Sequence, residues 1–221
     1  MSILEEQIGA TLMPGMYLPS PLKALFSWIE TNGLYIDRPT GERIGFLFPE
    51  AELKQGWTET ERPGGTIIEF FAKGNVNLKY WFGHERAEVM NRLCVFANTG
   101  AEGSMAALWL APGGEQKIVH LGSGSGSIMV CVLAEDPIDF LRLLAVGYDE
   151  ICWGDEYASP PNLDLTSGLV VRPNYLFRRW VETTFNVNIP ATGSEIVAYP
   201  HDMGRAGSED QFDQWVAESA A

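Results

Sequence analysis

A glycine-serine run is the first segment of this chain that could do chemistry. Glycine-rich loops can direct backbone N–H groups at a phosphate, and the run Gly122–Ser127 alternates the two residue types. A phosphate loop also needs Gly-Lys-Ser/Thr before a helix, whereas no lysine follows here and the next segment has the pattern of a strand. The run is also not a Gly-x-Ser-x-Gly nucleophile elbow, because a glycine and not a serine stands midway between Gly122 and Gly126. The run therefore predicts a flexible connection between strands.

The histidines and cysteines are the other candidates for catalysis or metal binding. They are His84, His120 and His201, and Cys94, Cys131 and Cys152. The histidines lack His-x-x-x-His or His-Glu-x-x-His spacing, and the cysteines lack Cys-x-x-Cys spacing, so we expect no metal site, no catalytic set and no cofactor. The cysteines have apolar neighbours and predict small buried residues in a reducing cytoplasm. An enzyme or small-ligand binder with a pocket under the Gly-Ser run and His120 is retained as an alternative.

Charge excludes several classes of partner. The 221 residues include 15 Lys and Arg against 29 Asp and Glu, a formal net charge of −14. DNA, RNA and anionic membranes all require a basic face, so none of them is an expected partner. A basic protein would be attracted by this field, although acidity also serves solubility alone. We expect neither a signal peptide nor a membrane span, because the first ten residues are acidic and no long apolar run occurs.

The acids concentrate between Glu135 and Glu156. This stretch contains seven acids and a single base, Arg142, which gives −6 over 22 residues. Aromatic residues beside charges are typical of protein interfaces, and Tyr148, Trp153 and Tyr157 lie among these acids. The predicted partner-binding residues are Asp149, Glu150, Trp153, Asp155 and Glu156. The alternative is a solvated helix end with its aromatic residues buried beneath.

Hydrophobic periodicity predicts the elements that position these residues. Alternation or short apolar runs predict strands over Leu34–Asp37, Arg43–Phe48, Thr66–Phe71, Asn75–Phe82, Met105–Leu110, Gln116–Leu121 and Ile128–Ala134. The last three have short links and predict an antiparallel meander. Met105–Leu110 and Ile128–Ala134 are apolar on both faces, which is typical of strands in the middle of a sheet and covered on each side.

Capping residues predict the helices. A polar residue followed by proline begins a helix at Ser20-Pro21 and another at Asp136-Pro137. Asn174 predicts the start of a third helix that runs through Phe185, and Ser208 with Gln211 has the spacing of a capping box before a last helix. The chain is expected to form a main domain over 1–157 and a C-terminal extension over 158–221 that packs on it.

A family resemblance rests on residues of the predicted meander and the helix that follows. Ala106-Ala-Leu-Trp-Leu110, Ile118-Val-His-Leu-Gly122, Asp136-Pro-Ile-Asp-Phe-Leu-Arg-Leu-Leu-Ala145 and Gly147-Tyr-Asp-Glu150 resemble the SUKH superfamily. The resemblance is best over about residues 90–152. It implies an α+β fold, with a central and mostly antiparallel sheet of about six strands and helices packed around it, and it supplies no catalytic residues.

The resemblance also implies a function. Bacterial members of that superfamily are immunity proteins that neutralise toxin domains, often nucleases, and a fungal branch regulates cell-wall synthesis through protein interactions. We therefore expect a cytoplasmic immunity-type protein, not an enzyme, that covers a basic toxin domain with an acidic surface. The alternative is a regulatory or scaffold module that binds a cellular partner.

Overall fold

A seven-stranded sheet forms the centre of the computed structural model, which describes residues 1–55, 61–63, 67–162 and 170–220. The strand order is β1-β2-β4-β5-β6-β7-β8, and each neighbouring pair is antiparallel. The strands are β1 (Tyr35–Asp37), β2 (Arg43–Gly45), β4 (Glu69–Phe70), β5 (Leu93–Asn98), β6 (Met105–Leu110), β7 (Gln116–Leu121) and β8 (Val130–Ala134). A separate parallel pair joins β3 (Glu61–Pro63) to β9 (Val170–Arg172). The expected α+β fold with a mostly antiparallel sheet is confirmed.

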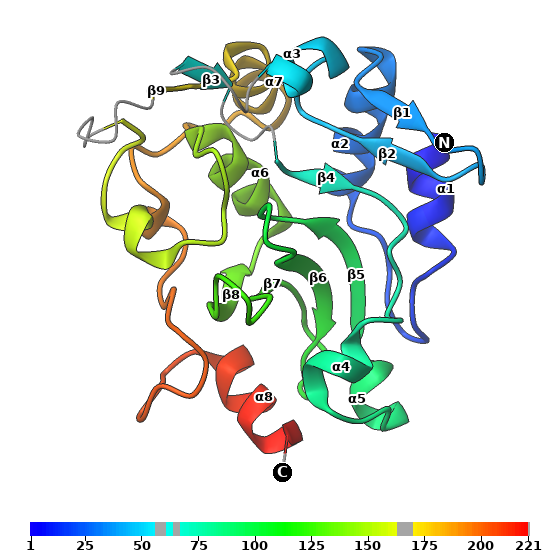
Figure 1. Ribbon diagram of the computed structural model, residues 1–221, viewed down its shortest axis with the longest axis vertical. Coiled ribbons are helices and arrows are strands. Elements are labelled where there is room, and N and C mark those ends of the chain that lie inside the picture. Colours follow the sequence, from blue (N-terminus) through cyan, green and yellow to red (C-terminus); the bar gives the residue numbers. More distant parts are fainter. Residues whose placement is uncertain (56–60, 64–66, 163–169, 221) are drawn as a thin grey trace.

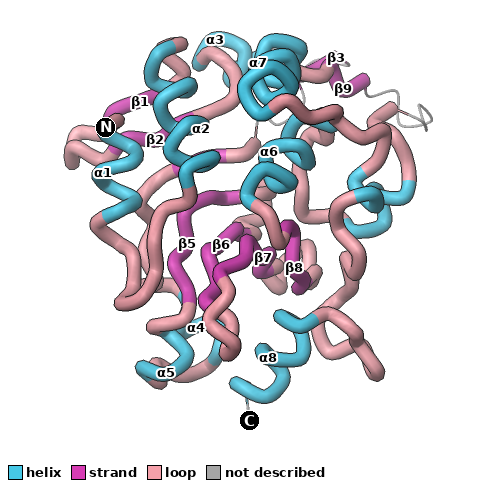
Figure 2. Tube along the Cα trace, turned by 180° about the vertical axis from the view of Figure 1, so that it is seen from behind, coloured by secondary structure: helices cyan, strands magenta, loops and turns pink. Residues whose placement is uncertain are grey.

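Helices cover both faces of this sheet (Figures 1 and 2). The helical elements are α1 (Ile3–Gly9), α2 (Ser20–Thr31), α3 (Glu50–Gln55), α4 (Leu78–Phe82), α5 (Ala87–Met90), α6 (Pro137–Val146), η1 (Gly154–Ala158), α7 (Tyr175–Phe185), η2 (Gly193–Glu195) and α8 (Gln211–Ala220). One buried cluster joins α1, α2, α6 and α7 to the sheet. A second joins α4, α5 and α8 to the opposite face.

The two-sided core explains the continuous apolar pattern of β6. Successive side chains of a strand point to opposite faces. Ala106 and Leu108 accordingly belong to the cluster under α1, α2, α6 and α7, whereas Ala107 and Trp109 belong to the cluster under α4, α5 and α8. Since both faces are covered, β6 needs apolar residues at every position, as predicted.

Local capping signals place two of the predicted helices correctly. The Asp136 side chain accepts a hydrogen bond from Ile138 N and begins α6, which ends where Gly147 adopts a left-handed φ of +102°. Asn174 accepts from Phe177 N and begins α7. Each of these signals acts within a few residues, so the sequence alone suffices to locate it.

The predicted strand over Asn75–Phe82 is wrong, because the segment forms a turn and the short helix α4. Leu78 and Phe82 are buried, whereas Val76 and Tyr80 are 73% and 77% exposed. The buried positions are therefore four residues apart, which suits a helix and not a strand. The Asn75 amide fixes the turn by donating to Met90 O and Leu93 O. The expected strand over Thr66–Phe71 reduces to β4, with Thr66 outside the described residues.

The expectation that β8 lies in the middle of the sheet is also wrong, because β8 is an edge strand. The C-terminal segment, residues 170–220, covers this edge. Val130 N donates to His201 O at 3.0 Å, and Val132 N donates to the Asp210 carboxylate at 2.9 Å. Asp210 also accepts from two amides at the start of α8, so Asp210 performs the capping role that was predicted for Ser208 with Gln211. The apolar composition of β8 therefore reflects an edge that the C-terminal segment covers.

Candidate binding groove

The structure separates the five predicted partner-binding residues into buried and exposed groups. Asp149 is only 8% exposed, so its carboxylate does not lie on a surface that a partner would touch. Glu150 is half-buried and accepts hydrogen bonds from Ala101 N at 3.0 Å and from the Trp153 indole N–H at 2.7 Å. Asp155 and Glu156 are exposed at the start of η1. Trp153 is half-buried beside them.

The two tyrosines of the acidic stretch are not surface anchors. Tyr148 and Tyr157 are 4% and 1% exposed. The Tyr148 hydroxyl donates to Ser159 O at 2.7 Å and accepts from Gly193 N at 2.8 Å, which ties the end of α6 to the C-terminal segment. The Tyr157 hydroxyl donates to Ile151 O at 2.7 Å, and burial raises its pKa. For these two residues, the reading with aromatic side chains buried beneath a solvated surface is the correct one.

The first three acids of the stretch have local structural partners. Glu135 pairs with Lys117 at 2.7 Å, and Asp139 pairs with Arg142 at 2.6 Å. Asp136 caps α6, where a carboxylate also favours the positive end of the helix dipole. The stretch from Glu135 to Glu156 is therefore not one continuous acidic surface, and the surface available to a partner narrows to its final residues.

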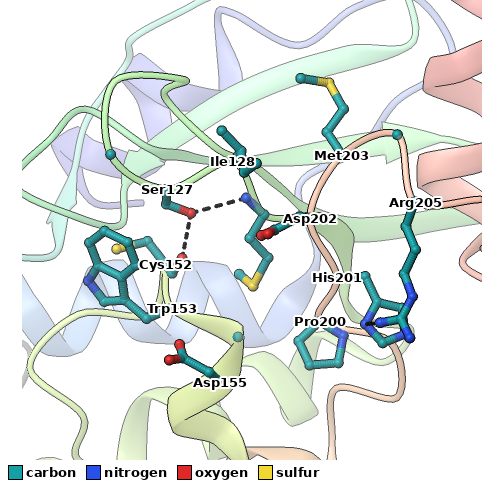
Figure 3. Close-up of a pocket in the computed structure, with 14 residues that line it drawn as sticks. Ser127, Ile128, Cys152, Trp153, Asp155, Pro200, His201, Asp202, Met203 and Arg205 are labelled. Carbon is teal, nitrogen blue, oxygen red and sulfur yellow. Dashed lines mark hydrogen bonds between the residues drawn. The ribbon is translucent and has the colours of Figure 1, made fainter.

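A groove of about 920 Å³ opens beside those final residues. Three segments line it, namely Gly126–Met129 between β7 and β8, Cys152–Asp155 before and within η1, and Pro200–Arg205 of the C-terminal segment (Figure 3). We call this feature the groove. The three segments are distant in sequence, and only Trp153 and Asp155 of the lining were among the predicted binding residues.

Hydrogen bonds hold the three walls of the groove together. Ser127 Oγ donates to Cys152 O at 2.6 Å and accepts from Met129 N at 3.1 Å, which joins the first two walls. Met203 N donates to Ile128 O at 2.9 Å and joins the third. These contacts use backbone groups or a buried hydroxyl, so the fold itself fixes the positions of the three walls.

Gly154 packs closely against the other walls of the groove. The backbone of Gly154 lies so near Pro200 that a Cβ at this position would collide with the Pro200 carbonyl oxygen. The same Cβ would come within 3.1 Å of Met129 Sδ. The second and third walls therefore meet at a position where only glycine fits.

The lining of the groove combines apolar side chains with charges of both signs. Ile128 and Met203 are 41% and 44% exposed. Asp155 and Asp202 contribute carboxylates from two different walls (Figure 3). The Arg205 guanidinium lies 2.8 Å from His201 Nδ1, and the guanidinium is the donor because it carries no acceptor. Such a lining can hold an amphipathic side chain, with its stem on apolar atoms and its head on a carboxylate.

The Gly-Ser run, Gly122–Ser127, is an ordered turn and not a phosphate cradle. All five amides from Gly122 to Gly126 donate within the protein: Gly122 N to Met129 O, Ser123 N to Ser104 Oγ, Gly124 N to Ser127 O, and Ser125 N and Gly126 N to Ser123 Oγ. A phosphate site needs such amides to point outward. The predicted role as a connection between strands is met, but by a turn with defined hydrogen bonds.

His120 and Cys152 lack the exposure or ionisation that chemistry in the groove would need. His120 is fully buried between Thr99 Oγ1 and Met129 O, each at 2.9 Å, and burial lowers its pKa to about 4. It does not line the groove. Cys152 does line it, but burial and the neighbouring carboxylates of Glu150 and Glu102 raise the pKa of its thiol. The thiol therefore stays protonated, unlike an activated nucleophile.

The burial of the cysteines and the grouping of the possible metal ligands bear on the other predicted chemistry. Cys94, Cys131 and Cys152 are all buried free thiols, as predicted. Within residues 1–55, 61–63, 67–162 and 170–220, no three His, Cys, Asp or Glu side chains are grouped so as to hold a metal ion. None of the helices in the described part of the chain is both long and apolar enough to cross a bilayer.

No family model, curated protein or solved structure matches this chain.

Proposed function

We propose that this protein binds a basic protein partner and acts as an immunity-type protein that neutralises a toxin domain. The observation that carries the proposal is the acidic rim of the groove, where Asp155 and Asp202 are exposed and the exposed Glu156 follows Asp155, on a chain with a net charge of −14. A nuclease toxin needs a basic cleft to hold nucleic acid. An acidic protein can cover such a cleft and keep nucleic acid out.

The resemblance of residues 90–152 to the SUKH superfamily supports the same role. The resemblance implies a protein that acts through contacts with other proteins. The three buried thiols suit a reducing cytoplasm, which is where an immunity protein must meet an incoming toxin. The proposed site is the groove rim with its half-buried Trp153, since large aromatic residues often anchor protein interfaces.

Co-expression tests this function directly. A toxin domain encoded beside this gene is produced in a bacterial host with and without the protein, and cell survival is counted. Protection by the protein is the expected result. Equal killing in both strains refutes the toxin role, whereas a stable complex with a cellular protein supports the regulatory alternative.

Charge reversal tests the site. The double variant Asp155→Lys/Glu156→Lys should bind the toxin more slowly, by about tenfold at low salt, because electrostatic steering acts mainly on the association rate. The matched control reverses two exposed acids elsewhere, Glu6→Lys on α1 and Glu218→Lys on α8, which alters net charge equally. Equal slowing in both double variants would show that net charge, and not this surface, directs binding.

A further inference from the structure

The two carboxylates of the groove belong to separate walls. Asp155 comes from η1, and Asp202 comes from the C-terminal segment, where its backbone pairs with Met129 beside the β8 edge (Figure 3). Ile128 and Met203 add partly exposed apolar surface to the same lining. The C-terminal segment is therefore a wall of the groove and not only a cover for the sheet.

The charge balance of the groove favours a cation. Its lining has two carboxylates against one guanidinium, that of Arg205, which already donates to His201. The groove lining therefore keeps a net negative charge, and the exposed Glu156 follows Asp155 in the chain. An incoming anion would meet two carboxylates, whereas an incoming cation would meet one arginine that is directed at a histidine.

The shape and chemistry of the lining favour arginine over lysine. An arginine has an aliphatic stem that can lie on Ile128 and Met203. Its planar guanidinium can stack on an aromatic ring and donate several hydrogen bonds in fixed directions. Trp153 supplies the ring, and Asp155 and Asp202 supply the acceptors.

We propose that the groove receives an arginine side chain from a basic segment of the partner protein, held between Trp153 and the carboxylates of Asp155 and Asp202. The inference rests on the proposed function for the identity of the partner as a basic protein. It adds that binding depends on the C-terminal segment, because one of the two carboxylates belongs to it.

Methyl NMR with peptide probes tests the occupant. The protein is labelled at its seven methionine methyl groups, of which Met129 and Met203 line the groove. It is titrated with acetylated, amidated hexaarginine, hexalysine, hexacitrulline and hexaglutamate. Hexaarginine should shift Met203 and Met129 most strongly and bind at least threefold more tightly than hexalysine. Tighter binding of hexacitrulline or hexaglutamate, or shifts confined to other methionines, would overturn the proposal.

Isosteric variants test the two carboxylates. Asp155→Asn/Asp202→Asn should weaken hexaarginine binding about tenfold, equivalent to about 1.4 kcal/mol. The control Glu6→Gln/Glu218→Gln removes the same charge from exposed positions on other elements and should change affinity less than twofold. Equal losses in both double variants overturn the proposal. Matching urea midpoints and unshifted Met13 and Met16 methyl signals establish that each variant is folded.

The single variant Asp202→Asn tests whether the C-terminal wall contributes to binding. Asp202→Asn should weaken hexaarginine binding about threefold although it alters only the C-terminal segment, and an unchanged affinity refutes the composite site. The protection assay with wild-type protein stays independent of these measurements. Protection without peptide binding in the groove refutes only the arginine inference, whereas groove binding without protection refutes only the toxin role.

Discussion

Acidification from pH 7 to pH 4 should weaken the fold through His120, a buried histidine of β7. The ring accepts the Thr99 hydroxyl hydrogen at one nitrogen and donates to the Met129 carbonyl from the other, each at 2.9 Å. This arrangement satisfies a neutral imidazole completely. A second ring proton would place a charge where the side chain is 0% exposed.

The magnitude follows from the pKa. Burial lowers the pKa of His120 from its ordinary 6.5 to about 4 in the folded protein. Between these values the unfolded chain binds a proton that the folded chain does not, so the free energy of unfolding rises with pH. The stabilisation is complete above about pH 6.5, falls progressively as the pH drops below that value, and is lost by about pH 4. Each tenfold difference in proton affinity is worth about 1.4 kcal/mol, which gives a loss of about 3 kcal/mol.

The assay compares wild type with His120→Gln, which cannot titrate in this range. Urea unfolding is followed by circular dichroism at pH 4, 5, 6 and 7. Contributions from the carboxylates are common to both proteins and cancel in the difference. The advantage of wild type over the variant should shrink by about 2–3 kcal/mol between pH 7 and pH 4. Parallel pH profiles would falsify the claim that His120 is buried in its neutral form.

Two further changes test how the C-terminal segment is attached. Asp210→Ala leaves three backbone amides without their acceptor and should cost about 2–4 kcal/mol in urea unfolding. The exposed control Glu218→Ala on the same helix should stay within about 0.5 kcal/mol, and similar losses would contradict the tether. Gly154→Ala places a methyl group against Pro200 O and should cost about 1–3 kcal/mol. It should also speed hydrogen exchange at Val130 N, which donates to the same segment, and unchanged exchange would rule out a separation of the walls.

The parts of the fold that were predictable from sequence are those set by neighbours in the chain. The meander β6-β7-β8 follows from three apolar runs with short links, and its pairing is antiparallel as expected. The start of α6 follows from Asp136-Pro137, and the start of α7 follows from Asn174. Each signal is a capping bond or a short apolar run, so it needs no knowledge of distant residues.

The strand prediction failed where the apolar pattern was too short to distinguish the period of a strand from that of a helix. Between Val76 and Phe82 the apolar residues recur every second position, which predicts a strand. The pattern also contains a spacing of four, from Leu78 to Phe82, and those two are the residues that the sheet buries. Asn75 favours the turn before the helix through hydrogen bonds to residues 15 and 18 positions later, and no local pattern reveals these bonds.

The candidate site was predictable only in part for the same reason. Counting charges located the stretch that contains Asp155 and Glu156, but it gave equal weight to Asp149, which is buried. Whether a carboxylate faces solvent depends on how α6 and η1 pack. The third wall of the groove lies about 45 residues beyond Asp155 in the chain, and its sequence, Pro200–Arg205, carries no binding motif.

The C-terminal segment joins the folding problem to the binding problem. Its helix α8 covers Trp109 on the sheet, its backbone and Asp210 meet the outward amides of β8, and its loop walls the groove. An uncovered edge strand invites pairing with other chains. The contacts that protect β8 also place Asp202 in the same groove lining as Asp155. A partner whose arginine binds both carboxylates would therefore also hold the C-terminal segment against the rest of the protein. Binding should raise the stability of the β8 edge.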